Sequence, residues 1–439
     1  MTQAAVYVAS CDRYDPESIA GHVRKAADAL GVTLPGSGSV LLHPSCPLAH
    51  PRFAPDAVTN PAVVEGAARS VSGASLTLAT ASLPGFPTRY SLGRAGYDRL
   101  AGRLRATKAA FDEGPYVPVP SAPALALPRS WVDASFRIAL PRLTGSAYLP
   151  FAGALRQLFG LLPAGTQSAE HHRMVETIGS LVLAARPDLV VVDAITATHR
   201  GGEPSGWPVD LGLLIIGTDP VAVDLVCGAA YGVPAVAMRD LVARLGRADA
   251  PGALADVRII GDVNLEELAR RGARVERMDP APENHALPRQ VRILRSPRAS
   301  PTGVSATLRE AFAVLDRAGI SLDKARETTI VIGAVDSVPP PTVDTAAIVF
   351  MDDTSRATYA GYSRIVRLTG RTPTLAKVLI DVPFAMTIAN VRAELGLSFT
   401  VAGLTARLSG MLRGSRGPGG AAAGSPGSKG GGDPAAQNR

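Results

Sequence analysis

Residues 189–224, LVVVDAITATHRGGEPSGWPVDLGLLIIGTDPVAVD, decide the fold that we expect for this chain. Two apolar runs, Leu189–Val192 and Leu211–Ile216, are rich in β-branched residues and lack polar alternation. Such runs are typical of strands that are buried on both faces, as in a sheet covered by helices. This segment therefore predicts two central strands of an α/β fold.

The same segment supplies the first candidate functional residues. Asp193 follows the first run, Asp219 lies just past the second, and the loop between them is broken by Gly201, Gly202, Pro204, Gly206 and Pro208. Ligands of open α/β sheets bind beyond the carboxyl ends of the strands. We therefore expect both acids and the glycine loop at that edge of the sheet, although these residues alone name no reaction.

The order of elements upstream indicates a parallel sheet. Strands are predicted at 5–10, 39–45, 75–80 and 136–143, and helices at 16–30, 61–68, 97–113, 151–161 and 168–185. Strands that alternate with helices favour parallel pairing. A further helix is predicted to begin at Asp219 and Pro220, where an acid suits a helix start.

Composition shifts divide the chain into four parts. We expect a first α/β domain over 1–275, a linker rich in proline and arginine over 276–300, and a smaller α/β unit over 301–410. Within the smaller unit the pattern predicts helices at 305–318 and 355–369 and strands at 329–335 and 346–351. Residues 411–439 are rich in Gly, Ala, Ser and Pro, which predicts a disordered tail.

Composition and charge limit the classes of function. The 439 residues are 46% apolar and 19% charged, as in a globular protein. Of the net charge of +7, 3 units come from the last 29 residues, and the remaining +4 with 5% aromatic residues disfavours a nucleic-acid partner. The N-terminus resembles no signal peptide, and charges interrupt every long apolar stretch, so we expect a cytoplasmic protein without membrane spans.

Acids and histidines are the candidates for catalysis. Asp193, Asp219 and Asp224 either contact a ligand or metal or fill structural roles, such as a helix cap at Asp219. His171 and His43 are candidates for moving a proton, with Asp193 orienting the imidazole. Neither histidine belongs to an H-x-x-x-H pair, so the sequence leaves open whether a metal binds.

Arginines and glycines are the candidates for binding. Arg142 and Arg156 would neutralise a carboxylate or phosphate, and we count Asp219 and Asp224 with them as ligand-binding candidates. The amides of Gly201, Gly202 and Gly206 would bind an anion as a nest, although GGEPSG lacks the lysine of a phosphate loop.

Several motifs resemble one family of proteins. LLHPS at 41–45, TNPAVVEGA at 59–67, LFGLLP at 158–163 followed by His171, GGEPSGWP at 201–208 and GTDPVAVD at 217–224 are similar to the domain of unknown function family 362. The resemblance covers about 4–262. It implies an α/β fold, often joined to ferredoxin-like iron–sulfur modules, and it implies no particular reaction.

The chain departs from the family pattern at charged positions. This chain has His43-Pro44-Ser45 at the position where the family that it resembles has Lys-Pro-Asn, and Arg156-Gln157 where that family has Lys-Asn. Arg142 lies in a stretch that lacks the lysines of the family. The three cysteines, Cys11, Cys46 and Cys227, form no cluster motif, so we expect no iron–sulfur cluster and no role as a redox partner.

Together these features predict a small-molecule site at the strand-end mouth of the first sheet. The leading hypothesis is an enzyme acting on a small anionic metabolite. The alternative is a non-catalytic ligand-binding or scaffold protein that has lost the family's lysines and iron–sulfur module. The sequence gives no substrate, cofactor or oligomeric state.

Overall fold

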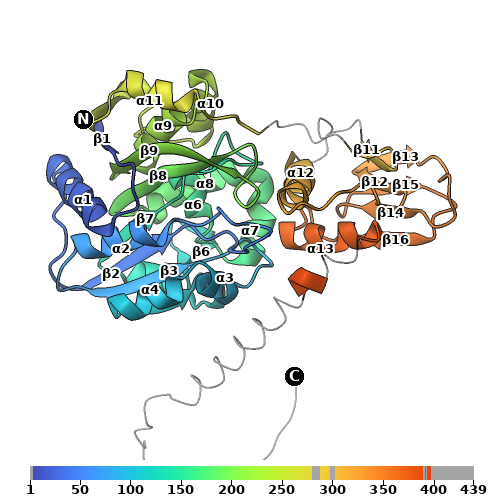
Figure 1. Cartoon of the computed structure of the whole chain (residues 1–439), viewed down its shortest axis with the longest axis horizontal. Coiled ribbons are helices and arrows are strands. Elements are labelled where there is room, and N and C mark those ends of the chain that lie inside the picture. Colours follow the sequence, from blue (N-terminus) through green and yellow to red (C-terminus); the bar gives the residue numbers. More distant parts are fainter. Residues whose placement is uncertain (1–2, 279–286, 297–301, 389–390, 392, 397–439) are drawn as a thin grey trace, which may run out of the picture.

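An eight-stranded sheet forms the centre of the first unit in the computed structural model, which describes residues 3–278, 287–296, 302–388, 391 and 393–396 (Figure 1). The strand order is β10-β1-β9-β8-β7-β2-β3-β4, and every strand except β9 runs in the same direction. The expected mostly parallel sheet is confirmed. Its strands are β1 (Ala4–Ser10), β2 (Ser39–Pro44), β3 (Ser75–Thr80), β4 (Thr107–Ala110), β7 (Phe136–Leu140), β8 (Leu189–His199), β9 (Trp207–Gly217) and β10 (Val257–Gly261).

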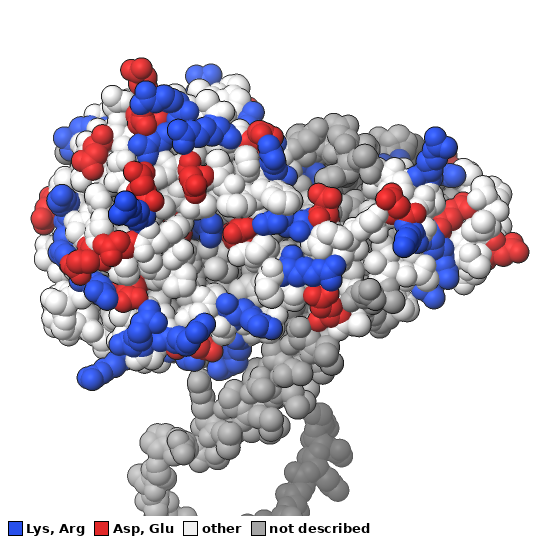
Figure 2. All heavy atoms as spheres, in the orientation of Figure 1, with Lys and Arg blue, Asp and Glu red and all other residues white. Residues whose placement is uncertain are grey.

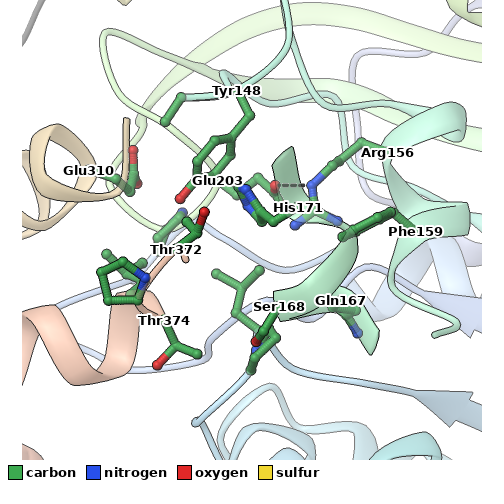
Figure 3. Close-up of a pocket in the computed structure, with 16 residues that line it drawn as sticks. Tyr148, Arg156, Phe159, Gln167, Ser168, His171, Glu203, Glu310, Thr372 and Thr374 are labelled. Carbon is green, nitrogen blue, oxygen red and sulfur yellow. Dashed lines mark ion pairs between the residues drawn. The ribbon is translucent and has the colours of Figure 1, made fainter. Parts of the chain in front are cut away.

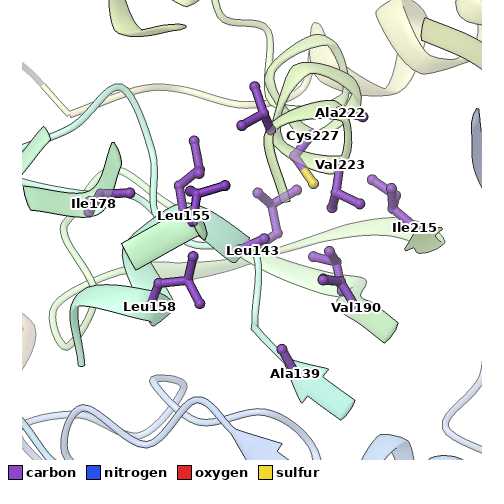
Figure 4. Packing of buried hydrophobic residues seen from close by; sticks show 14 of the residues in the cluster. Ala139, Leu143, Leu155, Leu158, Ile178, Val190, Ile215, Ala222, Val223 and Cys227 are labelled. Carbon is purple, nitrogen blue, oxygen red and sulfur yellow. The ribbon is translucent and has the colours of Figure 1, made fainter. Parts of the chain in front are cut away.

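Helices cover both faces of this sheet, because successive side chains of the buried strands point to opposite sides. Val191 of β8 packs among α1 (Pro16–Leu30), α2 (Pro61–Ser70) and α4 (Tyr97–Leu104). Val190 packs on the other face, with Leu143, Leu155 and Val223 (Figure 4). That face carries α6 (Ala154–Phe159), α8 (Met174–Ala184), α9 (Pro220–Ala230), α10 (Ala235–Arg244) and α11 (Leu265–Gly272).

The antiparallel strand β9 changes where the predicted site residues lie. Residues 200–206 join β8 to β9, and seven residues are too few for the crossover that a parallel pair needs. The end of β9 therefore lies at the amino-terminal edge of the parallel strands. Our expectation that Asp219 lies at the same edge as the glycine loop is wrong.

Three predicted helices differ from the observed elements. The helix predicted over 97–113 ends at Leu104, and β4 follows, because its residues pair with the open edge of β3. The helix predicted over 168–185 is divided into α7 (Ala164–Glu170), a short 3₁₀ turn (His171–Arg173) and α8. No helix occupies 355–369, where β15 (Arg356–Thr358) and β16 (Arg364–Arg367) pair with neighbouring strands. In these segments, tertiary pairing overrides weak helix propensity.

The second unit is built on a four-stranded parallel sheet, β11-β12-β14-β16. One face carries two helices, and the other is covered by a short strand pair, β13 with β15. The other elements of the second unit are β11 (Val291–Arg295), β12 (Thr328–Ile332), β13 (Ala334–Ser337), β14 (Ala347–Phe350), α12 (Thr302–Arg317) and α13 (Leu375–Ala385). The first unit also contains α3 (Thr88–Arg94), α5 (Arg129–Asp133), β5 (Tyr116–Val119) and β6 (Ala122–Pro128). The predicted disordered tail, 411–439, lies outside the described residues.

The two units share one apolar core. Leu48, Phe53 and Phe86 of the first unit pack in the same cluster as Leu308 of α12 and Leu379 of α13. Burying these side chains from both units holds the second unit against the loops at the carboxyl edge of the first sheet. This packing determines what can line a site at that edge.

Charges of both signs are interspersed over the face seen in Figure 2. Within the described part of the chain, no helix combines the length and the apolar character needed to cross a membrane.

Candidate functional site

A pocket lies between the carboxyl edge of the first sheet and the second unit (Figure 3). We call it the interunit pocket. Its volume of about 50 Å³ holds roughly four water molecules, so it suits a compact ligand. It is lined by Leu83, Pro84, Ala147, Tyr148, Arg156, Phe159, Gln167, Ser168, His171, Glu203, Pro204, Glu310, Thr372, Pro373, Thr374 and Leu375.

A smaller pocket of about 30 Å³ adjoins it at the ends of β2 and β3, and we call this one the strand-end pocket. The two pockets share four lining residues: Leu83, Arg156, Gln167 and Glu203. The other residues of the strand-end pocket are His43, Ser45, Cys46, Pro47, Thr80, Ala81, Ser82, Gln157 and Gly160. The two pockets are thus two compartments along one edge of the sheet.

An ion pair stands in the wall between the two pockets. The Nε atom of Arg156 lies 2.7 Å from Oε1 of Glu203, and both side chains are almost fully buried (Figure 3). Arg156 comes from α6 and Glu203 from the loop between β8 and β9. The pair neutralises both charges where water has little access.

Asp224 positions the helix that carries Arg156. Its carboxylate oxygens accept hydrogen bonds from the backbone N–H groups of Ala154 (2.8 Å) and Leu155 (3.0 Å) at the start of α6. Burial raises the pKa of Asp224 to about 7, although these two N–H groups act in the opposite direction. Asp224 is not among the residues that line either pocket, so it lies one contact behind them.

Glu310 reaches the interunit pocket from α12 of the second unit (Figure 3). Its Oε1 atom accepts a hydrogen bond of 3.3 Å from the backbone N–H of Ser205, and its Oε2 atom has no hydrogen-bond partner among the described residues. Burial, with the charge of Glu203 adding to it, raises the pKa of Glu310 to about 7. A Cβ atom at Gly202 would lie 2.0 Å from Oε2, so the carboxyl group needs the glycine there.

His171 faces Glu310 from the opposite side of the same pocket (Figure 3). Its ring lies edge-on to Tyr148, with centroids 4.3 Å apart, and its Nδ1 atom has no hydrogen-bond partner in the described part of the chain. Burial, helped by the charge of Arg156, lowers the pKa of His171 to about 3. The imidazole is therefore neutral at physiological pH.

His43 occupies the strand-end pocket. Its ring makes edge contacts with Phe111 and Trp131, at centroid distances of 5.1 and 5.6 Å, and burial lowers its pKa to about 3. Its backbone carbonyl accepts a 2.6 Å hydrogen bond from Nε2 of Gln157. His43 is therefore a neutral polar group in a partly aromatic wall.

The structure brings four predicted site residues together and places others elsewhere. His43, Arg156 and His171 line the pockets, and Gly202 lies against Glu310. Gly201 and Gly206 shape the same loop, because Cβ atoms there would collide with Ser205 and Thr198. The remaining candidates, Arg142, Asp193, Asp219 and Asp224, are not among the lining residues.

Asp193 does not lie at a strand end as we expected, because β8 continues to His199. Its side chain is fully buried on the α1–α2 face and accepts hydrogen bonds from Tyr14 Oη (3.0 Å) and Asn60 N (2.9 Å). Arg142 pairs with Asp193 in the backbone ladder, and its guanidinium donates to the carbonyl oxygens of Val58 and Thr196. The carboxylate of Asp193 and the two terminal guanidinium nitrogens of Arg142 thus have partners inside the protein, whereas Arg142 Nε has no hydrogen-bond partner among the described residues.

Asp219 lies at the opposite edge of the sheet, because β9 runs antiparallel to its neighbours. Its carboxylate accepts hydrogen bonds from the backbone N–H groups of Val221 and Ala222, which makes it the N-cap of α9. It also lies 3.9 Å from the guanidinium of Arg186. Asp219 and His171, which we expected in one site, therefore lie at opposite edges of the sheet.

Reasoning from the sequence misses the two carboxyl groups of the interunit pocket. Glu203 is visible there only as a charged residue within a Gly/Pro loop between two buried strands. Glu310 follows Thr307 by three residues and precedes Val314 by four, so helical periodicity places it on a buried face of α12. A charged residue on the buried face of a predicted helix is therefore the feature of the sequence that could have indicated Glu310 as a site residue.

Among the described residues, no three His, Cys, Asp or Glu side chains are grouped so that they could hold a metal ion. The three cysteines are all buried and unbridged.

Comparisons with known proteins give matches over parts of this chain. A thylakoid-associated protein of Synechocystis sp. is 28% identical over 226 residues, which are 48% of this chain and 70% of that protein. The lactate racemase apoprotein of Thermoanaerobacterium thermosaccharolyticum superposes with a TM-score of 0.34 at 12% identity, over 53% of this chain and 58% of that one. A Thermotoga maritima protein gives a TM-score of 0.32 at 9% identity, over 73% and 72%.

The family comparison covers the segment that supplies most of the two pockets. Residues 40–229 match the model of the domain of unknown function DUF362, which includes Arg156, His171 and Glu203 but ends before Glu310. The resemblance inferred from the sequence motifs is confirmed: residues 40–229 of this chain match the DUF362 family model.

Proposed function

We propose that this chain is an enzyme that removes a proton from, or adds one to, a small polar metabolite bound in the interunit pocket, with Glu310 as the acid–base group. The observation that supports this is a gathering of unsatisfied polar atoms. Six buried atoms that have no hydrogen-bond partner among the described residues belong to residues of the two pockets: His43 Nδ1, Arg156 Nε, Gln157 Oε1, His171 Nδ1, Glu310 Oε2 and Thr372 Oγ1. Of these, Arg156 Nε lies in the ion pair with Glu203. Buried polar groups are normally paired, so a bound ligand gives the other atoms the partners that the fold does not.

Glu310 has the properties of an acid–base group. Proton transfer is most efficient when the pKa of the catalytic group is near the working pH, and burial raises the pKa of Glu310 to about 7. His171 would orient the metabolite as a neutral imidazole, since its pKa is shifted in the other direction. Two groups in one pocket with pKa values pushed apart are typical of acid–base sites.

The charges of the pocket favour a metabolite without net charge. The sequence predicts an anionic ligand from Arg142 and Arg156 together, but Arg142 bonds to Val58 and Thr196 on another face. Arg156 is already paired with Glu203, and Glu310 adds a second carboxyl group. An incoming anion would have to displace Glu203 from Arg156.

Proton exchange with solvent tests the proposal even when the product of the reaction is not identified. Neutral metabolites of about four to six non-hydrogen atoms, a size set by the pocket volume, are incubated with the protein in D₂O and followed by ¹H NMR. We expect at least one to exchange a C–H proton, and Glu310→Gln to slow that exchange by about 100-fold or more.

The control is Glu276→Gln, which removes an exposed carboxylate paired with Arg200 and is expected to leave the exchange rate unchanged. Exchange that survives in Glu310→Gln contradicts the proposed role of Glu310. Binding without exchange by any member of the panel favours the alternative, a non-catalytic ligand-binding protein.

A further inference from the structure

We propose that the strand-end pocket binds a primary carboxamide group, as the end of the metabolite that lies beyond the Arg156–Glu203 pair. This inference rests on the proposed function, because it assigns one part of the same ligand. It names a chemical class that the pocket selects through Gln157, His43 and the ion pair.

The orientation of the Gln157 amide is fixed by its surroundings. Its nitrogen, Nε2, lies 2.6 Å from the carbonyl oxygen of His43, and a carbonyl oxygen only accepts hydrogen bonds. The amide therefore cannot be flipped, and Oε1 is the atom left over. Oε1 is buried and has no hydrogen-bond partner among the described residues. An occupant of this pocket must offer a hydrogen-bond donor to it.

The other residues that line the pocket favour a group that also accepts a hydrogen bond. The guanidinium of Arg156 is a donor, and the neutral imidazole of His43 has an Nδ1 atom without a hydrogen-bond partner in the described chain. A neutral imidazole donates or accepts according to its tautomer. A primary carboxamide carries N–H donors for Gln157 Oε1 and a carbonyl oxygen for Arg156 or His43.

Charge and size exclude the common alternatives. A carboxylate would place acceptor oxygens against Gln157 Oε1 and the carboxylate of Glu203, with no donor of its own. An ammonium group would add a positive charge beside Arg156. It would find no free carboxylate in Glu203, because Glu203 already pairs with Arg156 at 2.7 Å. The pocket volume of about 30 Å³ corresponds to two or three water molecules, which matches the three non-hydrogen atoms of a carboxamide.

Acetamide, acetate and N,N-dimethylacetamide are the probes, because they share an acetyl group and differ in charge and in hydrogen-bond donors. Each is titrated into the full-length ¹⁵N-labelled protein, and the side-chain NH₂ signal of Gln157 is followed by NMR. We expect acetamide to shift this signal and to bind at least tenfold more tightly than the other two. Equal binding of acetate, or no binding by any probe because the pocket holds only water, overturns the proposal.

Two substitutions separate recognition from general damage. Gln157→Leu removes the acceptor and is expected to weaken acetamide binding by tenfold or more. Gln290→Leu is the control, since the Gln290 amide lines neither pocket and donates to the backbone carbonyls of Leu322 and Asp323 in the second unit. Equal weakening by the two variants contradicts the proposal.

A third variant covers the case in which Gln157→Leu fails to fold. His43→Phe keeps a ring against Phe111 and Trp131 and removes Nδ1, so weaker acetamide binding by the folded variant supports the assignment. Unchanged binding by His43→Phe together with equal binding of acetate overturns it.

The outcomes for this inference and for the proposed function are distinguishable. Glu310→Gln is expected to bind acetamide with unchanged affinity, because Glu310 does not line the strand-end pocket. Proton exchange on a metabolite without acetamide binding removes only the carboxamide assignment. Acetamide binding without proton exchange on any metabolite removes only the proposed catalysis.

Discussion

Two buried carboxyl groups of this protein have opposite surroundings. Asp193 lies inside the first unit, and its two carboxylate oxygens accept hydrogen bonds from Tyr14 and from the backbone of Asn60. Glu310 lies in the interunit pocket with one hydrogen bond of 3.3 Å and one oxygen without a hydrogen-bond partner among the described residues. Both side chains are buried. The comparison shows that an unsatisfied carboxyl oxygen among the described residues, rather than burial, distinguishes Glu310 from Asp193.

The largest effect on stability is expected at Asp193. Asp193→Ala leaves the Tyr14 hydroxyl and the Asn60 N–H without an acceptor and removes the negative charge near Arg142, which should lower the free energy of unfolding by about 3–4 kcal/mol. Urea unfolding measures this change. If Asp193→Ala keeps the stability of the wild type but loses ligand binding, Asp193 is a binding residue and its proposed structural role is contradicted.

Glu310 should instead make stability depend on pH. Its pKa is about 7 in the folded chain against an ordinary 4.5, so its contribution is fully present below pH 4.5 and is lost as the pH rises through 7. We expect Glu310→Gln to remove on the order of 2 kcal/mol from the fall in unfolding free energy between pH 5 and pH 8.

Urea unfolding at a series of pH values measures this difference. Some of the fall should remain in Glu310→Gln, because the pKa of Asp224 is also raised to about 7. A profile for Glu310→Gln that matches the wild type would show that Glu310 is ionised in the folded protein at pH 5.

Asp224 is intermediate between the two carboxyl groups, since it is fully bonded but supports the pockets. Asp224→Asn turns one acceptor into an amide that faces a backbone N–H at the start of α6, at a cost of about 1–2 kcal/mol in unfolding free energy. Because α6 carries Arg156 and Gln157, we expect ligand binding to weaken as well, as measured by NMR titration. Weakened stability with intact binding would separate Asp224 from the site.

Gly202→Ala should have the smallest effect on stability and a clear effect on activity. The new Cβ atom would meet the end of the Glu310 side chain, which can move aside, so we expect a change in unfolding free energy below about 1 kcal/mol. Proton exchange should fall as Glu310 is displaced. Gly145→Ala is the contrasting variant, since its Cβ would lie 1.8 Å from the backbone oxygen of Gly201 and should destabilise the loop more strongly.

The sequence predicted the parts of the molecule that depend on local pattern. The parallel strands, the N-cap Asp219 and Pro220 at the start of α9 follow from hydrophobic runs and capping residues, and the structure confirms them. The direction of β9 had no such signal, because the predicted runs 189–192 and 211–216 leave 18 residues between them, enough for a crossover. Only the extension of both strands in the structure shortens the connection to residues 200–206.

The rest depended on contacts between distant segments. VVVD resembles a strand followed by a site residue, but β8 goes on pairing with β9 as far as His199, so Asp193 lies within the strand. Its carboxylate is bonded by Tyr14 and Asn60, more than 100 positions away. Glu310 lies about 100 residues beyond Glu203, and only the packing of the second unit brings them to one pocket. No local pattern contains that information.

A ¹³C NMR titration of the protein labelled at glutamate side-chain carboxyl groups tests whether Glu310 is an acid with a raised pKa. We expect one carboxyl signal that titrates near pH 7 and is absent from Glu310→Gln. If every glutamate signal instead titrates below about pH 5, Glu310 is an ordinary carboxylate and the proposed acid–base site is contradicted.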